Sequence, residues 1–196
     1  MKRDVELLYE IGALRLIPRQ WSRFHLTAVQ NLTEHHYRVM WLALVIAARE
    51  KQCDTEKILK MAMIHDIAES RTGDVDYLAR QYVVRHEDEA IKDMLRDTSL
   101  EAEFLELWEE YEARKTIESK IVKDADTLDV DLDLREQAAT GNLLPDQWTK
   151  QRAHVHETQL FTKTAKQLYK DIDASNPHDW HIKSPQNRLN GGDWKK

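Results

Sequence analysis

The sequence predicts an all-α fold, and three observations support this prediction. Glycine is scarce, with five glycines and four prolines in 196 residues, whereas average glycine usage is roughly 7%. Sandwiches, barrels and doubly wound sheets need many tight turns, whose positive φ angles glycine supplies. Apolar residues recur at helical spacing along most of the chain, and no segment shows convincing strand alternation. We therefore expect a single bundle of about seven helices.

The first half of the chain is predicted to hold three helices. The first covers residues 3–14 and is followed by a less regular stretch over 15–32. Asn31 and Glu34 have the spacing of a capping box, so a helix should begin there and run to about Arg49. The next helix should begin at Asp54 or Thr55 and end near Gly73.

The second half is predicted to continue as helices and to end in an irregular tail. The stretch over 76–96 is amphipathic, with a break near His86 left open, and helices follow over 100–114 and 116–139. Gly141 suits a helix C-cap, and Pro145 suits the first turn of a last long helix that reaches Ile172. We assign residues 1–174 to one domain, with the motifs within about 30–140, and residues 175–196 to an irregular C-terminal tail that carries two tryptophans.

Composition excludes several classes of protein. The chain is 41% hydrophobic, which is enough for a core, and its only cysteine, Cys53, cannot form an intramolecular disulfide. No apolar run approaches the ~20 residues that cross a bilayer, and the first residues do not resemble a secretory signal. The net charge of −6 disfavours binding to long nucleic acid. We expect a soluble cytoplasmic protein with no membrane partner.

Three segments combine the residue types that bind metals with a helical context. They are Glu34-His35-His36, then His65-Asp66 with Glu69 and Gly73-Asp74 after it, and Lys123-Asp124-Ala125-Asp126. On a helix, Glu69 shares a face with His65 and Asp66, because it lies four and three residues beyond them. It is therefore placed to polarise a water. Each segment alone is a weak signal.

Taken together, the segments resemble the HD-domain phosphohydrolases, in particular the small 5'-deoxynucleotidase branch, over roughly residues 5–140. The motifs are Glu-His-x-x-Arg-Val from residue 34, Met-Ala-x-Ile-His-Asp-Ile-Ala-Glu-x-x-Thr-Gly-Asp from residue 61, and Ile-Val-Lys-Asp-Ala-Asp from residue 121. The resemblance implies that one divalent metal is held by His35, His65, Asp66 and Asp126.

The resemblance also implies the catalytic and substrate-binding residues. Glu69 matches the catalytic glutamate of the family, and Asp74 matches an aspartate that contacts the sugar. The segment Ile17-Pro18-Arg19-Gln20-Trp21 is similar to one in which the arginine meets phosphate and the tryptophan packs near the deoxyribose, where it restricts a 2'-hydroxyl.

The chemistry of these residue types agrees with that implication. Two neutral imidazoles and two carboxylates neutralise a divalent ion, and mixed nitrogen and oxygen ligation suits Mn²⁺, Co²⁺, Fe²⁺, Ni²⁺ or Zn²⁺. Such an ion polarises a phosphoryl oxygen and acidifies water, and Glu69 would orient that water or take its proton. Arg19, with Arg80 and Lys123, would neutralise phosphate charge. Binuclear members of the superfamily have extra histidines between the His-Asp pair and the last aspartate, but His86 alone occurs here, which favours one metal.

Several alternatives stay open at this stage. The first choice is hydrolysis of a deoxynucleoside 5'-monophosphate to nucleoside and phosphate. The alternative is a deoxynucleoside triphosphate triphosphohydrolase that releases triphosphate, and a non-catalytic nucleotide-binding protein is less favoured. Relatives of this type imply a homo-oligomer, in the first instance a dimer. Asp129 and Asp133 recur on the face of Asp126, but we interpret them as solvated or paired carboxylates.

Overall fold

The computed structural model describes residues 1–25 and 29–186, and within them it confirms the all-α prediction. The only β pairing in this part of the chain is an isolated bridge between Pro18 and Asn31. The longer helices are α1 (Lys2–Ala13), α3 (Leu32–Ala47), α4 (Thr55–Ile64), α6 (Glu87–Leu95), α7 (Glu101–Ala113), α8 (Ile117–Ala139), α9 (Leu144–Gln159) and α10 (Lys163–Asp173). The single-turn elements are α2 (Ser22–His25), α5 (Glu69–Thr72), α11 (Asp179–Ile182) and the 3-10 turns η1 (Leu14–Leu16) and η2 (Ala79–Gln81).

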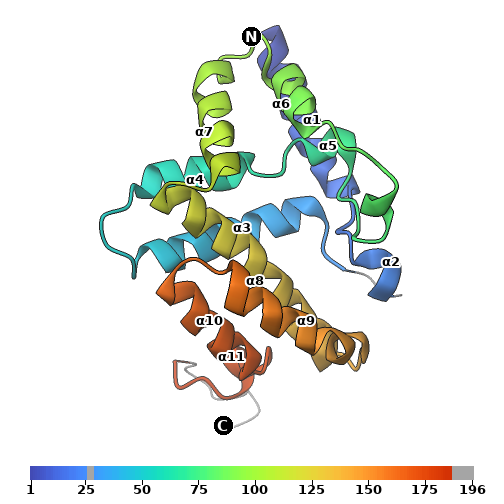
Figure 1. Cartoon of the computed structure of the whole chain (residues 1–196), viewed down its shortest axis with the longest axis vertical. Helices are drawn as coiled ribbons and strands as arrows, with labels where there is room; N and C mark the ends of the chain where they lie inside the picture. Colours follow the sequence, from blue (N-terminus) through green and yellow to red (C-terminus); the bar gives the residue numbers. More distant parts are fainter. Residues whose placement is uncertain (26–28, 187–196) are drawn as a thin grey trace, which may run out of the picture.

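Helices α3 and α8 form the centre of the bundle (Figure 1). Helix α4 packs on α3, α7 packs against α4 and α8, and α9 and α10 lie along the other side of α8. The core that joins them is made of aliphatic side chains with little or no exposure, among them Leu32, Ile46, Ile58, Met61, Ile121 and Leu128. Burial of this apolar surface stabilises the bundle and fixes α3, α4 and α8 relative to one another.

The predicted caps are confirmed. The Asn31 side chain accepts the N–H of Glu34 at 3.0 Å, and the Glu34 carboxylate accepts the N–H of Asn31 at 2.9 Å, so α3 begins with a complete capping box. Gly73 ends α5 with φ at 74°, a conformation that glycine adopts at little cost. Both helix ends lie beside predicted site residues, so these caps place the site as well as the helices.

The predicted single helix from Asp54 to Gly73 is wrong, because α4 ends at Ile64 and α5 begins at Glu69. In between, the backbone hydrogen bonds join residues three apart, from Ile67 N–H to Ile64 O at 3.3 Å and from Glu69 N–H to Asp66 O at 3.0 Å. Bonds of this i→i+3 kind belong to turns and 3-10 segments. His65 and Asp66 therefore lie in a turn at the end of α4, and not in the middle of a helix.

The predicted long helix from Pro145 to Ile172 is also wrong, because α9 and α10 are separate. The carboxylate of Asp124, on α8, accepts the backbone N–H groups of Phe161 and Thr162 at 2.8 Å each. The Thr162 side chain then caps α10 by accepting the N–H of Ala165. The break near His86, which the sequence left open, is present, since His86 is the N-cap of α6.

The predicted tail is only partly described. It contains the short helix α11, where Trp180 is 73% exposed, and residues 187–196, including Trp194, lie outside the described residues. In the part of the chain that the structure describes, no helix has the length and apolarity needed to cross a membrane.

Candidate metal centre and active-site cavity

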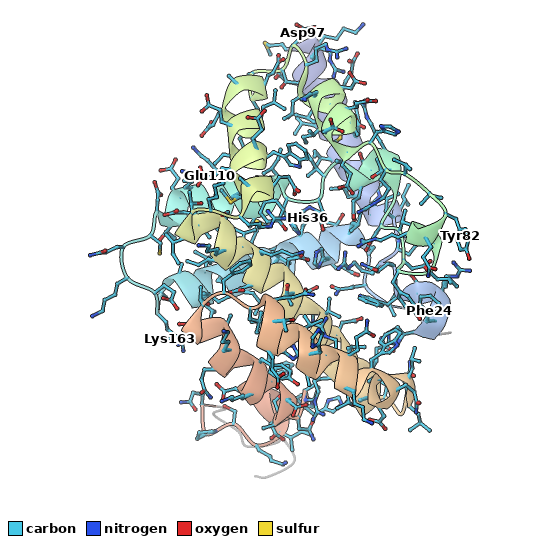
Figure 2. All side chains as sticks on the ribbon, viewed as in Figure 1. Phe24, His36, Tyr82, Asp97, Glu110 and Lys163 are labelled. Carbon is cyan, nitrogen blue, oxygen red and sulfur yellow. The ribbon has the colours of Figure 1, made fainter. Side chains whose placement is uncertain are left out.

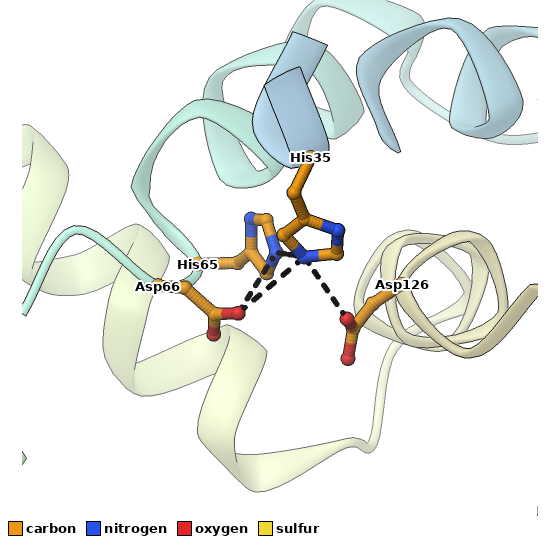
Figure 3. A group of neighbouring side chains, drawn as sticks. All are labelled: His35, His65, Asp66 and Asp126. Carbon is orange, nitrogen blue, oxygen red and sulfur yellow. Dashed lines mark hydrogen bonds and ion pairs between the residues drawn. The ribbon is translucent and has the colours of Figure 1, made fainter. Parts of the chain in front are cut away.

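The side chains of His35, His65, Asp66 and Asp126 converge, and one donor atom from each lies within 4.8 Å of the others (Figure 3). His35 Nε2 lies 3.3 Å from Asp126 Oδ1 and 3.6 Å from Asp66 Oδ2. His65 Nε2 lies 3.3 Å from both His35 Nε2 and Asp66 Oδ2. The four residues that the sequence predicted as ligands are thus brought together in space.

Three elements hold these donors in place. His35 lies in the first turn of α3, directly after the capping box, and His65 and Asp66 lie in the turn that ends α4. Asp126 projects from the middle of α8. Because α3 packs against both α4 and α8, the core of the bundle fixes the spacing of the donors.

The donor set fits a divalent cation. His35 Nδ1 lies 2.6 Å from Asp129 Oδ2, and His65 Nδ1 lies 2.8 Å from the carbonyl oxygen of Ala62. Each acceptor favours the ring tautomer with a proton on Nδ1, which leaves an Nε2 lone pair aimed at the centre. Two lone pairs 3.3 Å apart repel each other unless a cation lies between them. Ligands bound at about 2.0–2.2 Å to one ion have this kind of separation.

The charge at the centre also calls for a cation. Burial of His35 and the positive charge of Arg19 oppose protonation of its ring. Hydrogen bonds to three carboxylates outweigh both effects and raise the pKa of His35 to about 10. The carboxylates therefore attract positive charge to this point, and a divalent ion supplies it without a proton on the ligand.

His36 is a buried neighbour outside the group of four donors. Its Nδ1 lies 2.7 Å from the carbonyl oxygen of Leu32, and its ring centroid lies 4.6 Å from that of His65. Figure 2 shows its place at the centre of the molecule. Burial and the charges of His65 and His35 lower the pKa of His36 to about 3. The ring therefore packs as a neutral group beside the donors.

The donors open into a cavity of about 430 Å³, which also contains the other predicted site residues. Its walls come from α5, α7, α8 and α9, from the turn that follows α4, and from the segments that precede α2 and α6. The predicted catalytic and substrate-binding residues that line it are Arg19, Trp21, Glu69, Asp74, Arg80 and Lys123. Among the four donors, His65, Asp66 and Asp126 face this cavity, while His35 lies behind them.

Glu69 is held at one oxygen and unpaired at the other. Arg85 donates to Glu69 Oε1 at 3.0 Å, whereas Oε2 is buried and makes no hydrogen bond. Burial, together with the carboxylates of Asp66 and Asp74, raises the pKa of Glu69 to about 10. Without a cation at the donors, this carboxyl group therefore holds a proton, and the positive charge of a bound cation would favour the carboxylate form that can accept a proton from water.

Arg19 and Asp74 form a buried ion pair beside Glu69. Arg19 Nη1 lies 2.6 Å from Asp74 Oδ2, and their side chains are only 3% and 1% exposed. The backbone N–H of Gln20 also donates to Asp74 Oδ2 at 3.0 Å. Arg19 Nε and Asp74 Oδ1 remain buried without a partner. Each residue thus has one polar atom without a hydrogen bond, a donor on Arg19 and an acceptor on Asp74, and both residues line the cavity.

Trp21 belongs to an aromatic cluster at one end of the cavity. Its ring centroid lies 5.0 Å from that of Trp148 on α9, and its Nε1 is buried without a partner. Trp148 also packs edge-on against Phe24 and His25, and Phe24, labelled in Figure 2, stacks on Tyr77.

The other two predicted substrate residues, Arg80 and Lys123, are less buried. Arg80 Nε donates to the carbonyl oxygen of Val75, and Lys123 Nζ lies 2.7 Å from Asp126 Oδ2.

Sequence reasoning missed several residues of the site. Asp129 was interpreted as solvated or paired, and the structure shows it paired with the ring of His35. Its position three residues after Asp126 was the available signal. Trp148, Arg85 and Arg114 also line or support the cavity, but each comes from an element whose position relative to α4 and α8 no local pattern reveals.

The HD-domain family profile matches residues 11–175, which is most of the chain. The chain belongs to the HD-domain family. It is 31% identical to 5'-deoxynucleotidase HDDC2 of Bos taurus over 138 residues, which cover 67% of this chain and 66% of that protein. The Homo sapiens protein of the same name is 30% identical over 138 residues, with 67% of each chain covered. The chain thus spans about two thirds of the length of these curated relatives.

The fold is shared with solved structures. A conserved hypothetical protein from Pyrococcus furiosus matches with a TM-score of 0.72 and 27% identity, covering 86% of this chain and 98% of that one. Since this likeness spans nearly the whole of that protein, the arrangement of α3, α4 and α8 around the donors belongs to a fold found in other organisms.

Proposed function

We propose that this HD-domain protein is a metal-dependent 5'-deoxynucleotidase that hydrolyses deoxynucleoside 5'-monophosphates to deoxynucleoside and phosphate. The observation that carries the proposal is the convergence of four donors on one edge of a cavity that also holds Glu69 and several cationic side chains. A metal centre, a carboxyl group and cations are the parts that phosphate-ester hydrolysis requires. The HDDC2 proteins, whose name states this activity, support the same conclusion.

We propose His35, His65, Asp66 and Asp126 as the ligands of one divalent cation. A cation held there would polarise a phosphoryl oxygen and acidify water. The mixed donor set suits Mn²⁺, Co²⁺, Fe²⁺, Ni²⁺ or Zn²⁺. Asp129 and the carbonyl oxygen of Ala62 fix the two imidazole rings from behind, at 2.6 and 2.8 Å.

Glu69 is the proposed general base. Its unpaired Oε2 accepts the proton of the attacking water, while Arg85 holds Oε1 and so fixes the plane of the carboxylate. The water oxygen forms a bond to phosphorus as the bond from phosphorus to the 5'-oxygen breaks. The departing 5'-oxygen takes up the proton that Glu69 has accepted, so Glu69 returns to the carboxylate and the products are a nucleoside hydroxyl and inorganic phosphate.

The remaining predicted residues would bind the substrate. Arg19 and Lys123 supply positive charge close to the donors, and Arg80 supplies it from a more exposed position. Asp74 offers its unpaired Oδ1 to a sugar hydroxyl. Trp21 would pack against the deoxyribose and leave no room for a 2'-hydroxyl, and Trp148 holds it in that position.

The curated relatives favour a monophosphate substrate over the alternative deoxynucleoside triphosphate, because they are named 5'-deoxynucleotidases. A product-resolved assay decides the matter. Deoxy- and ribonucleotides with one to three phosphates are incubated with metal-depleted protein and each of the five divalent ions. Free phosphate from dAMP supports the proposal, whereas triphosphate from dATP without phosphate from dAMP would establish the alternative.

If the protein binds nucleotides but hydrolyses none of them with any of the five metal ions, it is instead a non-catalytic member of the family. The predicted homodimer remains a prediction, and sedimentation of the purified protein tests it.

A further inference from the structure

Arg114 lies at the wall of the same cavity in a backbone conformation that arginine rarely adopts. It follows the last residue of α7, and its φ and ψ are 52° and 29°, in the left-handed region. Glycine or asparagine is usual at such a helix end, because other side chains clash with the backbone there. The left-handed conformation of Arg114 therefore costs free energy, and it places an arginine side chain at the cavity wall.

The Arg114 guanidinium is held in one orientation by an aromatic ring. Its central carbon lies 3.3 Å from the centroid of the Tyr111 ring, a cation–π contact. Tyr111 is 2% exposed and packs edge-on against His65, with 5.8 Å between the ring centroids. A single aromatic ring therefore separates the guanidinium from one of the proposed metal ligands.

The hydrogen bonds of Arg114 are incomplete. Its Nη2 lies 3.2 Å from Glu112 Oε1, and the Glu112 side chain is 47% exposed, so this ion pair is weak. Its Nη1 is buried and makes no hydrogen bond. A buried charged donor without an acceptor is costly, and the Arg114 side chain is part of the cavity wall.

A second cation lines the same cavity. Lys123 and Arg114 both line it and repel each other, whereas the carboxylates of Asp126 and Asp66 attract Lys123, and Lys123 Nζ lies 2.7 Å from Asp126 Oδ2. Asp126 is also a proposed metal ligand, so a bound cation would compete for its charge. With Asp126 engaged by a cation, Lys123 and Arg114 would be left with less negative charge around them, and an anion bound between them would restore it.

We infer that Arg114 and Lys123 form an anion subsite that binds the non-bridging oxygens of the substrate's phosphate. A guanidinium presents two parallel N–H groups that match a phosphate edge, and an ammonium adds a point charge. Only the identification of the anion as substrate phosphate rests on the proposed function. Inorganic phosphate, the product of that reaction, occupies the same subsite.

The test uses inorganic phosphate as the probe and calorimetric titration of the metal-loaded protein as the measurement. Replacing Arg114 by glutamine removes the charge, and we expect phosphate affinity to fall roughly ten- to hundredfold, as for loss of a charge-assisted hydrogen bond. The phosphate affinity of Arg114→Gly should fall equally, and this variant should stay folded, since glycine suits the left-handed conformation. The phosphate affinity of Arg114→Lys should fall less. Arg96→Gln is the matched control, because Arg96 is exposed and paired with Asp93 away from the cavity.

The kinetic arm separates this inference from the proposed function. With dAMP, Arg114→Gln should raise KM by a factor similar to the loss of phosphate affinity, and kcat should change less. Unaltered phosphate binding in both Arg114→Gln and Arg114→Gly, or no phosphate binding by the unmodified protein, would overturn the subsite. If phosphate binding depends on Arg114 but no nucleotide is hydrolysed, the subsite stands and the proposed function fails.

Discussion

His35 Nδ1 lies 2.6 Å from Asp129 Oδ2, and neither side chain is exposed to solvent. Arg38 donates to the other oxygen of Asp129, and Arg38 in turn lies 2.7 Å from Glu136 at the surface. The ring of His35 is therefore locked by a chain of charges that reaches from the surface to the centre of the site. Such a chain fixes both the tautomer and the direction of the ligand nitrogen.

Replacing Asp129 by asparagine should weaken metal binding about 10- to 100-fold, the range found when a ligand's supporting carboxylate is lost. Competition of Mn²⁺ between the protein and a chelating dye measures the effect. Asp131→Asn is the matched control on the same helix, because Asp131 pairs with Arg152 and His156 and touches none of the four donors. Equal metal affinity in Asp129→Asn and the unmodified protein would contradict the positioning role of Asp129.

Alanine in place of His65 or Asp66 should remove both the bound metal and the hydrolysis of dAMP. Each change deletes one of four donors and leaves the others too few to hold the ion. Metal content is measured by elemental analysis after gel filtration, and folding by circular dichroism. If the well-folded, metal-free variants kept full turnover, the proposed metal mechanism would be wrong.

Trp21→Ala should abolish the preference for deoxynucleotides, since the indole ring would no longer exclude a 2'-hydroxyl. Trp148→Leu should weaken the preference in part, because Trp148 packs against Trp21 with 5.0 Å between ring centroids. The measured quantity is the ratio of kcat/KM for dAMP to that for AMP. A ratio near one in the unmodified protein, unchanged in Trp21→Ala, rejects the role of Trp21.

The donors could be predicted because three short motifs together resemble those of the HD-domain phosphohydrolases, and each motif is local in the sequence. His65 and Asp66 are adjacent, Glu69 follows in the next turn, and the capping box fixes where α3 begins before His35. The helical bundle followed from the same kind of pattern. These features depend on residues a few positions apart, where periodicity and capping are informative.

The boundary between α9 and α10 could not be predicted in the same way, because its cause is distant in the sequence. The boundary between α9 and α10 depends on Asp124, which accepts backbone N–H groups 37 and 38 residues further along the chain. The contact of Arg114 with the cavity depends on how α7 packs against α4 and α8. Periodicity indicates which face of a helix is apolar, but it does not say which other helix covers that face.

Asp74→Ala should destabilise the metal-free protein by about 3 kcal/mol, because it leaves the buried charge of Arg19 without its closest partner. Urea unfolding measures the change. The double variant Arg19→Met, Asp74→Ala removes both charges and should recover much of the lost stability. The free energy of unfolding is also measured for Arg19→Met alone. If the double variant loses as much free energy of unfolding as the two single variants lose in sum, or more, the pair is not energetically coupled.

Asp133 should make the protein less stable as pH rises from about 4 to 6. It is 4% exposed, and Oδ2 is buried without a hydrogen bond. Burial, opposed by the charge of Arg38 and assisted by nearby carboxylates, raises its pKa to about 6 from 3.8. The folded state therefore binds this proton more tightly than the unfolded state. The resulting stability is fully present below pH 3.8 and is lost as pH rises through 6.

Asp133→Asn isolates this effect, because asparagine has nearly the same shape and stays neutral at every pH. At pH 7 the variant should be more stable than the unmodified protein by at most about 3 kcal/mol, the free energy that corresponds to the change in pKa. Below pH 4 the difference should vanish, since Asp133 is then protonated in both states. Urea unfolding at a series of pH values gives the two curves. Parallel curves between pH 4 and 7 would mean that Asp133 titrates in the folded protein as it does in the unfolded chain.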